Sequence, residues 1–220
     1  HVAMPKELTA EEISDIIDEF AAATRRAIQA GFDGIELHGA NTFLLQQFMS
    51  PLSNQREDSF GGSLANRMKF PIFLVNQVKA VAKQLADKPF IIGYRLSPEE
   101  IEAGGLTLKD NLMLAMVLKE IGIDYLSLSL RQYNQLPLTS DKLQSFAIPD
   151  IFRKAVGDLP LMVAGALNSP QNLEDAHADM LAVGSKLFMD PMWPEELATG
   201  QSHLGAPITG GVPYSNVWPN

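Results

Sequence analysis

The chain has 220 residues, 46% of them hydrophobic, so it can bury a sizeable core within one domain. Its net charge is −9, and no stretch gathers enough lysine and arginine to make nucleic acid or an anionic membrane surface an expected partner. The absence of cysteine excludes disulfides, thiol nucleophiles and iron–sulfur ligation.

The four histidines, His1, His38, His177 and His203, form no pair with metal-ligand spacing, so we expect no bound metal. No apolar run approaches the ~18 residues that a membrane helix needs, and the N-terminus lacks the apolar stretch of a signal peptide. A cytoplasmic protein is therefore expected. His1 stands where a natural chain would begin with Met, which indicates a cut point.

The first predicted element is a helix over residues 10–30. Thr9 and Glu12 have the spacing of a capping box, and apolar residues recur after them at helical intervals. Gly31 is expected to end this helix. Residues 32–37 then predict a short strand that ends at His38.

Helices and strands alternate along the rest of the chain. The further predicted strands are 89–94, 124–129, 159–164 and 180–183, and the predicted helices are 63–85, 108–121, 149–156, a short one after Pro170 and a last one from Pro191. Strict alternation predicts one parallel sheet covered by helices. Neither the 136–150 segment nor the Gly- and Pro-rich 205–220 segment indicates a domain boundary.

Five βα units fit either an open doubly wound sheet or part of a barrel. No G-x-G-x-x-G motif follows any predicted strand, and Gly104-Gly105 has the wrong continuation for one, which disfavours a dinucleotide-binding sheet. A complete eight-stranded barrel takes about 250 residues. The predicted fold is therefore an α/β fold, a TIM-type (β/α)8 barrel that is incomplete, with about five of eight units present.

His38 and Asn41 lie three residues apart just beyond a predicted strand, at the edge where barrel enzymes place their active sites. An imidazole N–H and a carboxamide N–H can share one carbonyl oxygen as acceptor. Negative charge that builds on that oxygen during attack at a conjugated carbon would then be stabilised. Alternatively, His38 only caps a turn.

Two glycine-containing turns follow the last two predicted strands. They are Gly165-Ala166 and Gly184-Ser185, and each alone would be an ordinary turn. In β/α barrels, phosphate is often bound at these two places by backbone amides, which glycine allows to approach closely. Their order predicts a phosphate site.

Four segments together are similar, in order and spacing, to the signature of the Old Yellow Enzyme (NADH:flavin oxidoreductase) family. They are AGFDGIELHGAN at 30–41, LLQQFMSP at 44–51, NQREDSFGGS at 54–63 and NR at 66–67. The resemblance continues more loosely to about Gly200. It implies that 1–220 is the C-terminal part of a single FMN-binding barrel domain whose first three strands are not in this sequence.

The resemblance implies that FMN binds at the carboxyl end of the barrel and is reduced by NADH or NADPH. The flavin then passes a hydride from N5 to an activated alkene, a quinone or a related small electrophile. His38 and Asn41 would bind the carbonyl oxygen of the substrate, Arg95 would lie beside the flavin pyrimidine ring, and the two glycine turns would hold the phosphate. Alternatively, Arg95 pairs with Glu36 inside the barrel.

The sequence departs from the family at two site positions. Phe43 stands where members that reduce enones usually carry the tyrosine that protonates the substrate. Ser185 stands where an arginine commonly binds the FMN phosphate, and we expect the side chain of the neighbouring Lys186 to point the other way. Alkene reduction is expected to be slow, since a general acid typically contributes about 10²–10⁴-fold.

One other function stays open. A degenerate or truncated barrel could bind a phosphate ligand or a partner without redox activity, as Phe43, Ser185 and the absent strands suggest. A lyase would need a Schiff-base lysine or a metal–carboxylate set at the strand ends, and the sequence offers neither: Lys88 precedes a strand, on the face that serves stability, and Lys186 follows the phosphate-type glycine. The choice between NADH and NADPH, the side of the loop to which Tyr133 turns, and the formation of a homo-oligomer stay open as well.

Overall fold

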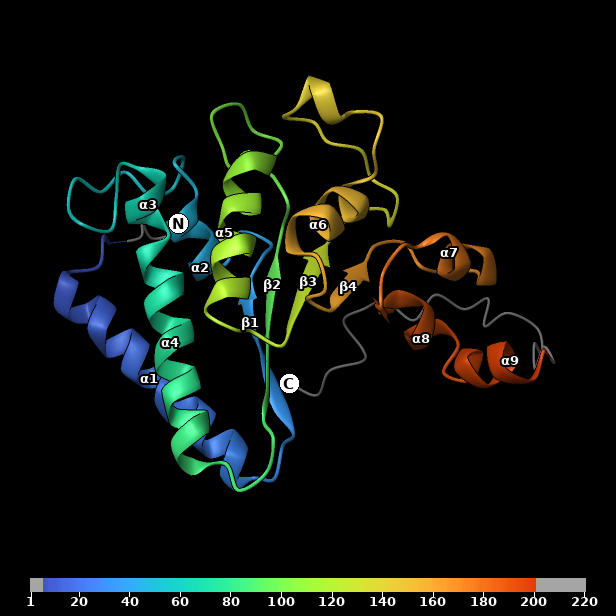
Figure 1. Ribbon diagram of the computed structural model, residues 1–220, viewed down its shortest axis with the longest axis horizontal. Coiled ribbons are helices and arrows are strands. Elements are labelled where there is room, and N and C mark those ends of the chain that lie inside the picture. The colour runs from blue at the N-terminus through green and yellow to red at the C-terminus, as the bar shows by residue number, and fades with distance from the viewer. Residues whose placement is uncertain (1–5, 201–220) are drawn as a thin grey trace, which may run out of the picture.

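The computed structural model describes residues 6–200, apart from the Asp141 side chain. His1, His203 and the 205–220 segment lie outside the described residues. The described chain contains a five-stranded parallel sheet in the order β1-β2-β3-β4-β5 (Figure 1). Its strands are β1 Gly34–Gly39, β2 Ile91–Leu96, β3 Tyr125–Ser129, β4 Leu161–Ala164 and β5 Met180–Ala182.

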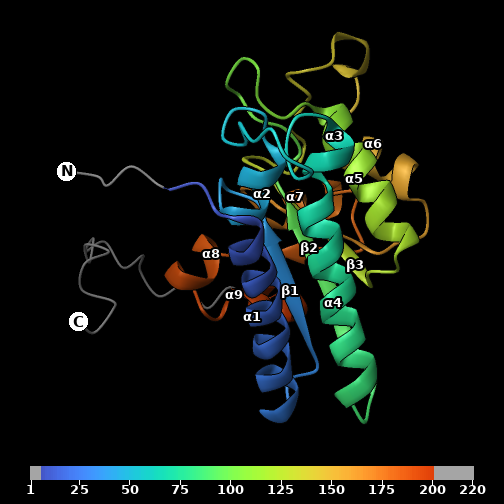
Figure 2. The ribbon, with the colours of Figure 1, turned by 90° about the vertical axis from the view of Figure 1, so that its left-hand side faces the viewer.

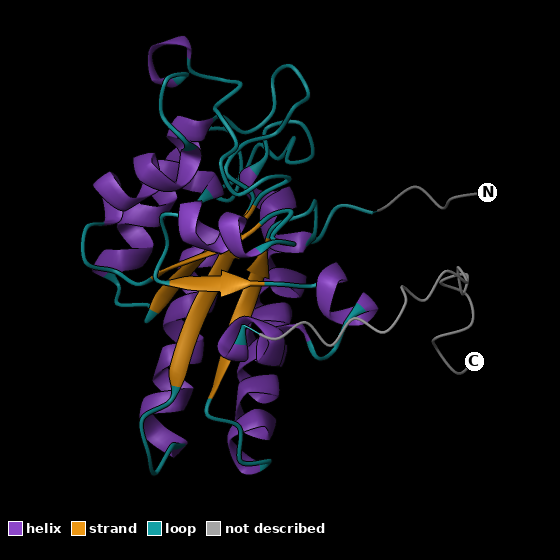
Figure 3. Ribbon diagram, turned by 90° about the vertical axis from the view of Figure 1, so that its right-hand side faces the viewer, coloured by secondary structure: helices purple, strands orange, loops and turns teal. Residues whose placement is uncertain are grey.

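The helices are α1 Ala10–Gln29, α2 Leu44–Met49, α3 Leu64–Arg67, α4 Lys69–Leu85, α5 Leu108–Glu120, α6 Ile148–Val156, α7 Pro170–Asp175, α8 Ser185–Met189 and α9 Trp193–Thr199, with a 3-10 turn η1 at Asp141–Leu143. Helices α1 and α4 lie side by side in front of the sheet in Figure 2 and behind the strands in Figure 3. No helix within residues 6–200 is both long and apolar enough to cross a membrane.

The strand order identifies the architecture. Each strand pairs with the next one along the chain, all in parallel, so the order never reverses as it does in a doubly wound sheet. A singly wound sheet of this kind is a segment of a (β/α) barrel. The prediction of an incomplete TIM-type barrel with five βα units is confirmed.

The two faces of the sheet differ in polarity. Toward the helices it presents apolar side chains that are almost fully buried, among them Leu37, Tyr94, Leu126, Leu128 and Val163. The residues between them in sequence point to the opposite face, because side chains alternate along a strand. In Figure 1 the loops after β1, β2 and β3 rise above the upper end of the sheet, which is its carboxyl end.

The structure agrees with the predicted start of the first helix. Glu12 N donates to Thr9 Oγ1 (3.1 Å) and Thr9 N donates to Glu12 Oε2 (2.7 Å), so the capping box that the sequence indicates is present. The predicted 63–85 helix is wrong in one detail, since it is divided at Met68 into α3 and α4. The short helices α2 and α8 were not predicted.

The strands β1, β2 and β4 begin two residues later than the sequence suggests, and β3 one residue later. Asp33 lies in the turn before β1, where it forms an ion pair with Lys88 from the turn before β2. This pair marks the amino end of the sheet. Lys88 is therefore far from the carboxyl end, where barrel enzymes bind substrate, as the sequence predicts.

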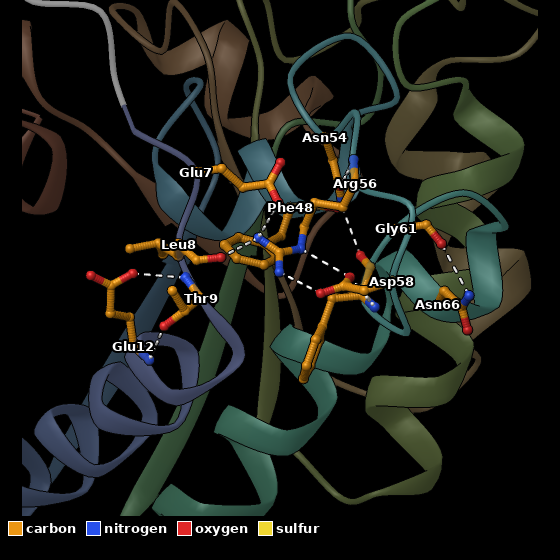
Figure 4. A network of polar contacts seen from close by, with 11 residues as sticks. Glu7, Leu8, Thr9, Glu12, Phe48, Asn54, Arg56, Asp58, Gly61 and Asn66 are labelled. Atoms are coloured by element: carbon orange, nitrogen blue, oxygen red, sulfur yellow. Dashed lines mark hydrogen bonds and ion pairs between the residues drawn. The ribbon is translucent and has the colours of Figure 1, made fainter.

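Arg56 joins the segment before α1 to the loop between α2 and α3 (Figure 4). Its Nη1 donates to the Leu8 carbonyl (2.6 Å) and its Nε donates to Asp58 Oδ1 (3.0 Å). The side chain is 8% exposed, although that of Asp58 is 42% exposed. In the same loop, Asn54 Nδ2 donates to the carbonyl groups of Phe48 (2.6 Å) and Phe60 (2.8 Å). The loop between α2 and α3 is thus fixed to the segment before α1.

We expect Arg56→Ala to lower the free energy of unfolding of the full-length protein by about 1–3 kcal/mol, because it leaves the Leu8 carbonyl without its donor and Asp58 without its cationic partner. Arg25→Ala, at an exposed position of α1, is the control and should change it by less than about 0.5 kcal/mol. Urea denaturation measures both. Equal effects of the two substitutions would contradict the role of Arg56.

Candidate active site on the polar face of the sheet

The face of β1, β2 and β3 that points away from the helices carries a set of polar side chains. In the register of the sheet, Glu36 is opposite Gly93 and His38 is opposite Arg95. Gly93 is opposite Tyr125, and Arg95 is opposite Ser127. Because the register aligns these positions across three strands, residues 89 positions apart in sequence lie next to each other.

Glu36 is at the centre of this set. Its Oε1 lies 2.7 Å from Arg95 Nε, and its Oε2 accepts a hydrogen bond from the Tyr125 hydroxyl (3.0 Å). The pairing of Arg95 with Glu36, left open by the sequence, is thus present in the structure. Burial and the nearby negative charge of Glu36 raise the pKa of Tyr125 to about 12, so this phenol stays protonated and donates.

Gly93 leaves the space that the Tyr125 ring occupies. A Cβ atom at position 93 would lie 2.1 Å from Cζ of that ring. Any other residue would therefore push Tyr125 away from Glu36. This glycine is needed for close approach between β2 and β3 and not for an unusual backbone angle.

His38 is half-buried at the carboxyl end of β1. Burial and the positive charge of Arg95 lower the pKa of His38, and the negative charge of Glu36 opposes this in part. At neutral pH the ring is therefore uncharged and keeps one N–H donor. The ring of Phe43, which is 59% exposed, lies against it with a centroid distance of 5.0 Å.

Asn41 and Thr42 both have a left-handed backbone, with φ of 56° and 62°. Such a conformation is uncommon for a β-branched residue and marks local strain. Two hydrogen bonds hold it: Asn41 N donates to Ser97 Oγ (2.9 Å), and Thr42 N donates to Gln46 Oε1 (3.0 Å). The turn after β1 is thereby fixed to the loop after β2 and to α2.

The Asn41 amide is oriented by a residue that the sequence did not point to. Ser129, the last residue of β3, donates a hydrogen bond from Oγ to Asn41 Oδ1 (3.0 Å). The amide oxygen is then occupied, and the Nδ2 hydrogens have no acceptor among residues 6–200. No local motif marks Ser129 or Ser97, because each acts on a residue more than 50 positions away.

The two glycine turns follow the paired strands β4 and β5, as the sequence predicts. A Cβ at Gly165 would lie 2.9 Å from the backbone of Gln132, so this glycine is already required by the loop that follows β3. Ala166 has a left-handed φ of 49°. Gly184 meets no atom within 4 Å at its Cβ position, and Ser185 begins α8.

The ammonium group of Lys186 contacts the side chains of Asp190 and Trp193. Lys186 lies on α8, whereas a strand or turn was expected, and its Nζ is 2.9 Å from Asp190 and 5.7 Å from the centre of the Trp193 ring. Only the secondary structure at this position differs from the expectation, and an i,i+4 ion pair and a cation–π contact hold the ammonium group. It is not a free cation or a free nucleophile beside Ser185.

A groove of about 620 Å³ lies beside α2, and Thr42, Arg56 and Glu100 are among its lining residues. Two of its charged groups are already paired: Glu100 accepts from Gln46 Nε2 (2.8 Å) and Ser50 Oγ (2.6 Å), and Arg56 binds Asp58. None of the residues that the sequence singled out for chemistry lines this groove. We therefore place the candidate site on the polar face.

The polar face fits the pyrimidine end of a flavin better than it fits a metal. Within the described residues no cluster of three or more histidine or carboxylate groups could hold a metal ion. Ser127 Oγ is buried there without a hydrogen-bond partner, Arg95 Nε contacts only the Glu36 carboxylate, and neither terminal nitrogen of Arg95 makes a hydrogen bond within residues 6–200. A cation and an orphaned hydroxyl on one face suit a polar ring edge that carries negative charge.

Comparisons with known proteins agree on the family. The sequence pattern of the NADH:flavin oxidoreductase / NADH oxidase family matches residues 1–203. A probable NADH-dependent flavin oxidoreductase, YqiG of Bacillus subtilis (strain 168), is 40% identical over 206 residues, which are 88% of this chain and 53% of that protein. The NADH:fumarate oxidoreductase of Klebsiella pneumoniae (strain 342) is 40% identical over 205 residues, 90% of this chain and 22% of that protein. The chain thus spans about half the length of the first relative and less of the second.

Solved structures show the same architecture. Morphinone reductase in complex with tetrahydroNAD aligns with a TM-score of 0.70 and 28% identity, over 90% of this chain and 52% of that one. A 2-naphthoyl-CoA reductase aligns with a TM-score of 0.75 and 26% identity, over 89% of this chain and 30% of that one. The matched pattern over residues 1–203 shows that the chain belongs to the NADH:flavin oxidoreductase / NADH oxidase family.

Proposed function

We propose that this chain is part of an FMN-dependent NAD(P)H oxidoreductase that reduces activated alkenes, quinones or related electrophiles, and that it forms the later βα units of a single barrel domain. The observation that carries the proposal is that His38 and Arg95 are opposite each other at the carboxyl ends of β1 and β2, with Asn41 in the turn directly after β1. The family and the named activities of the relatives support it. FMN, when bound, accepts a hydride from NADH or NADPH and delivers it to the substrate.

His38 and Asn41 bind the carbonyl oxygen of the substrate in this proposal. The neutral imidazole offers one N–H, and the Asn41 amide offers Nδ2 because Ser129 occupies its oxygen. Two donors that converge on one oxygen stabilise the negative charge that develops there. The strained turn at Asn41 and Thr42 fixes the distance between the two donors before substrate binds.

The two ends of the cofactor would be held unequally. At the ring end, Arg95 supplies a permanent positive charge beside the pyrimidine. At the phosphate end, Gly165, Ala166, Gly184 and Ser185 offer backbone amides and one hydroxyl, and Lys186 is occupied by Asp190. This difference favours weaker FMN binding than an arginine at position 185 would give. It is also the observation that favours the second candidate, a barrel that binds a phosphate ligand without redox activity.

A flavin titration of the full-length protein tests the proposal. We expect the protein to bind FMN and the bound flavin to bleach on anaerobic addition of NADH or NADPH. His38→Ala and Asn41→Ala should leave this bleaching intact and lower turnover of an enone or a fumarate-like substrate by about 10²–10³-fold, as loss of one oxyanion donor does. His177→Ala, an exposed position that pairs with Asp150, is the matched control.

Absorbance spectra and stopped-flow rates give the outcome. A protein that ignores FMN but binds inorganic phosphate would support the second candidate and overturn the first. Bound FMN that NADH and NADPH both fail to reduce would also contradict the proposed reaction.

The position of Phe43 generates a second prediction. Its exposed ring lies against His38, where a hydroxyl on the ring would reach the substrate side of the site. We expect Phe43→Tyr to raise the rate of alkene reduction by about 10²-fold, because the phenol can donate the proton that the substrate carbon needs. Quinone reduction, which does not need a carbon-bound proton, should change little. An equal change in both rates would contradict the assignment.

A further inference from the structure

The centre of the polar face is a carboxylate to which the proposed function gives no role. Glu36 divides its two oxygens between β2 and β3: Oε1 lies 2.7 Å from Arg95 Nε, and Oε2 accepts from the Tyr125 hydroxyl at 3.0 Å. The charged and titratable groups that face it are Arg95 on β2, Tyr125 on β3 and His38 on its own strand.

The contact is made on the inner side of the guanidinium. Because Glu36 approaches Nε, the two terminal nitrogens of Arg95 are left without hydrogen bonds within residues 6–200. Tyr125 in turn fixes the other carboxylate oxygen, and Gly93 makes room for its ring. The carboxylate is thus held from two strands, and it determines which side of Arg95 is free.

We propose that Glu36 is a positioning residue that orients Arg95 and offsets its positive charge, so that it limits how strongly Arg95 favours negative charge on a ring bound at this face. The inference rests on the proposed function and deepens it. An ionised Glu36 beside Arg95 brings the net charge of the pair to zero. Any group bound at the free side of Arg95 therefore meets a dipole and not an isolated cation.

The proposed role predicts an increase in the midpoint potential of bound FMN when the charge of Glu36 is removed, which a purely structural role does not predict. Glu36→Gln keeps the shape and a hydrogen-bond acceptor but removes the negative charge. The uncompensated Arg95 then stabilises the anionic reduced flavin more strongly, so the midpoint potential of bound FMN should rise. Arg95→Gln should lower it. A side chain that acted only by packing would not shift the potential upward on loss of its charge.

His38 reports on the same charges without any cofactor. It lies on the same face and experiences both groups: the charge of Arg95 lowers its pKa and that of Glu36 raises it. Glu36→Gln should therefore lower the pKa of His38, and Arg95→Gln should raise it. Nuclear magnetic resonance titration of the imidazole in the cofactor-free full-length protein measures these shifts.

The experiment combines the two readouts on the wild-type protein, Glu36→Gln, Arg95→Gln and Glu36→Asp. The control is Glu57→Gln, which removes one carboxylate that makes no ion pair or hydrogen bond within the described residues and lies in an exposed loop. We expect opposite shifts for Glu36→Gln and Arg95→Gln, partial return toward wild type in Glu36→Asp, and no shift in Glu57→Gln.

The outcomes distinguish failure of the role of Glu36 from failure of the proposed function. A His38 pKa that is unchanged in Glu36→Gln, or a flavin potential that is unchanged or lowered, overturns the role of Glu36. Failure of the wild-type protein to bind FMN overturns the proposed function, and the His38 shifts still decide whether Glu36 offsets the charge of Arg95. If Glu36→Gln does not fold, Glu36→Asp and Arg95→Gln decide it by the same two measurements.

Discussion

The register of the three parallel strands β1, β2 and β3 is the constraint on which the candidate site depends. It places Glu36, Gly93 and Tyr125 in one row and His38, Arg95 and Ser127 in the next. Since side chains alternate along a strand, a slip of one residue would send these polar groups into the apolar core and bring Leu37 and Leu126 to the site. Burial of the leucines on the helix face therefore fixes the position of the charged groups on the other face.

The same register brings together the loops that follow β1, β2 and β3, which hold the Asn41 turn. The turn after β1 carries Asn41 and a strained backbone, and it is held by Ser97 from the loop after β2 and by Ser129 from the end of β3. Three successive strand ends therefore cooperate at one donor pair. Arg56, in the following loop, fixes the same region to the segment before α1 (Figure 4). The loops at the carboxyl end of the sheet are thus held to one another and to the segment before α1.

The parts of the fold that follow from local sequence were predicted, and those that follow from distant contacts were not. The capping box at Thr9 and the alternation of strand and helix identified α1 and the barrel segment. Helices α2 and α8 are too short for a periodic signal. The sequence could not decide whether Arg95 contacts a ligand or pairs with Glu36, because that depends on the register between β1 and β2. The contacts of Lys186 with Asp190 and Trp193 were not predicted, since they require α8.

A crystal structure of the full-length protein with FMN bound would show directly whether these strands form the flavin site. The flavin should lie on the polar face, with its pyrimidine edge at the terminal nitrogens of Arg95 and with Glu36 still at Nε. His38 and Asn41 should line the open side of the ring. A flavin bound elsewhere, or an Arg95 that leaves Glu36 and turns from the ring, would contradict the central claim that the register of three strands builds the cofactor site.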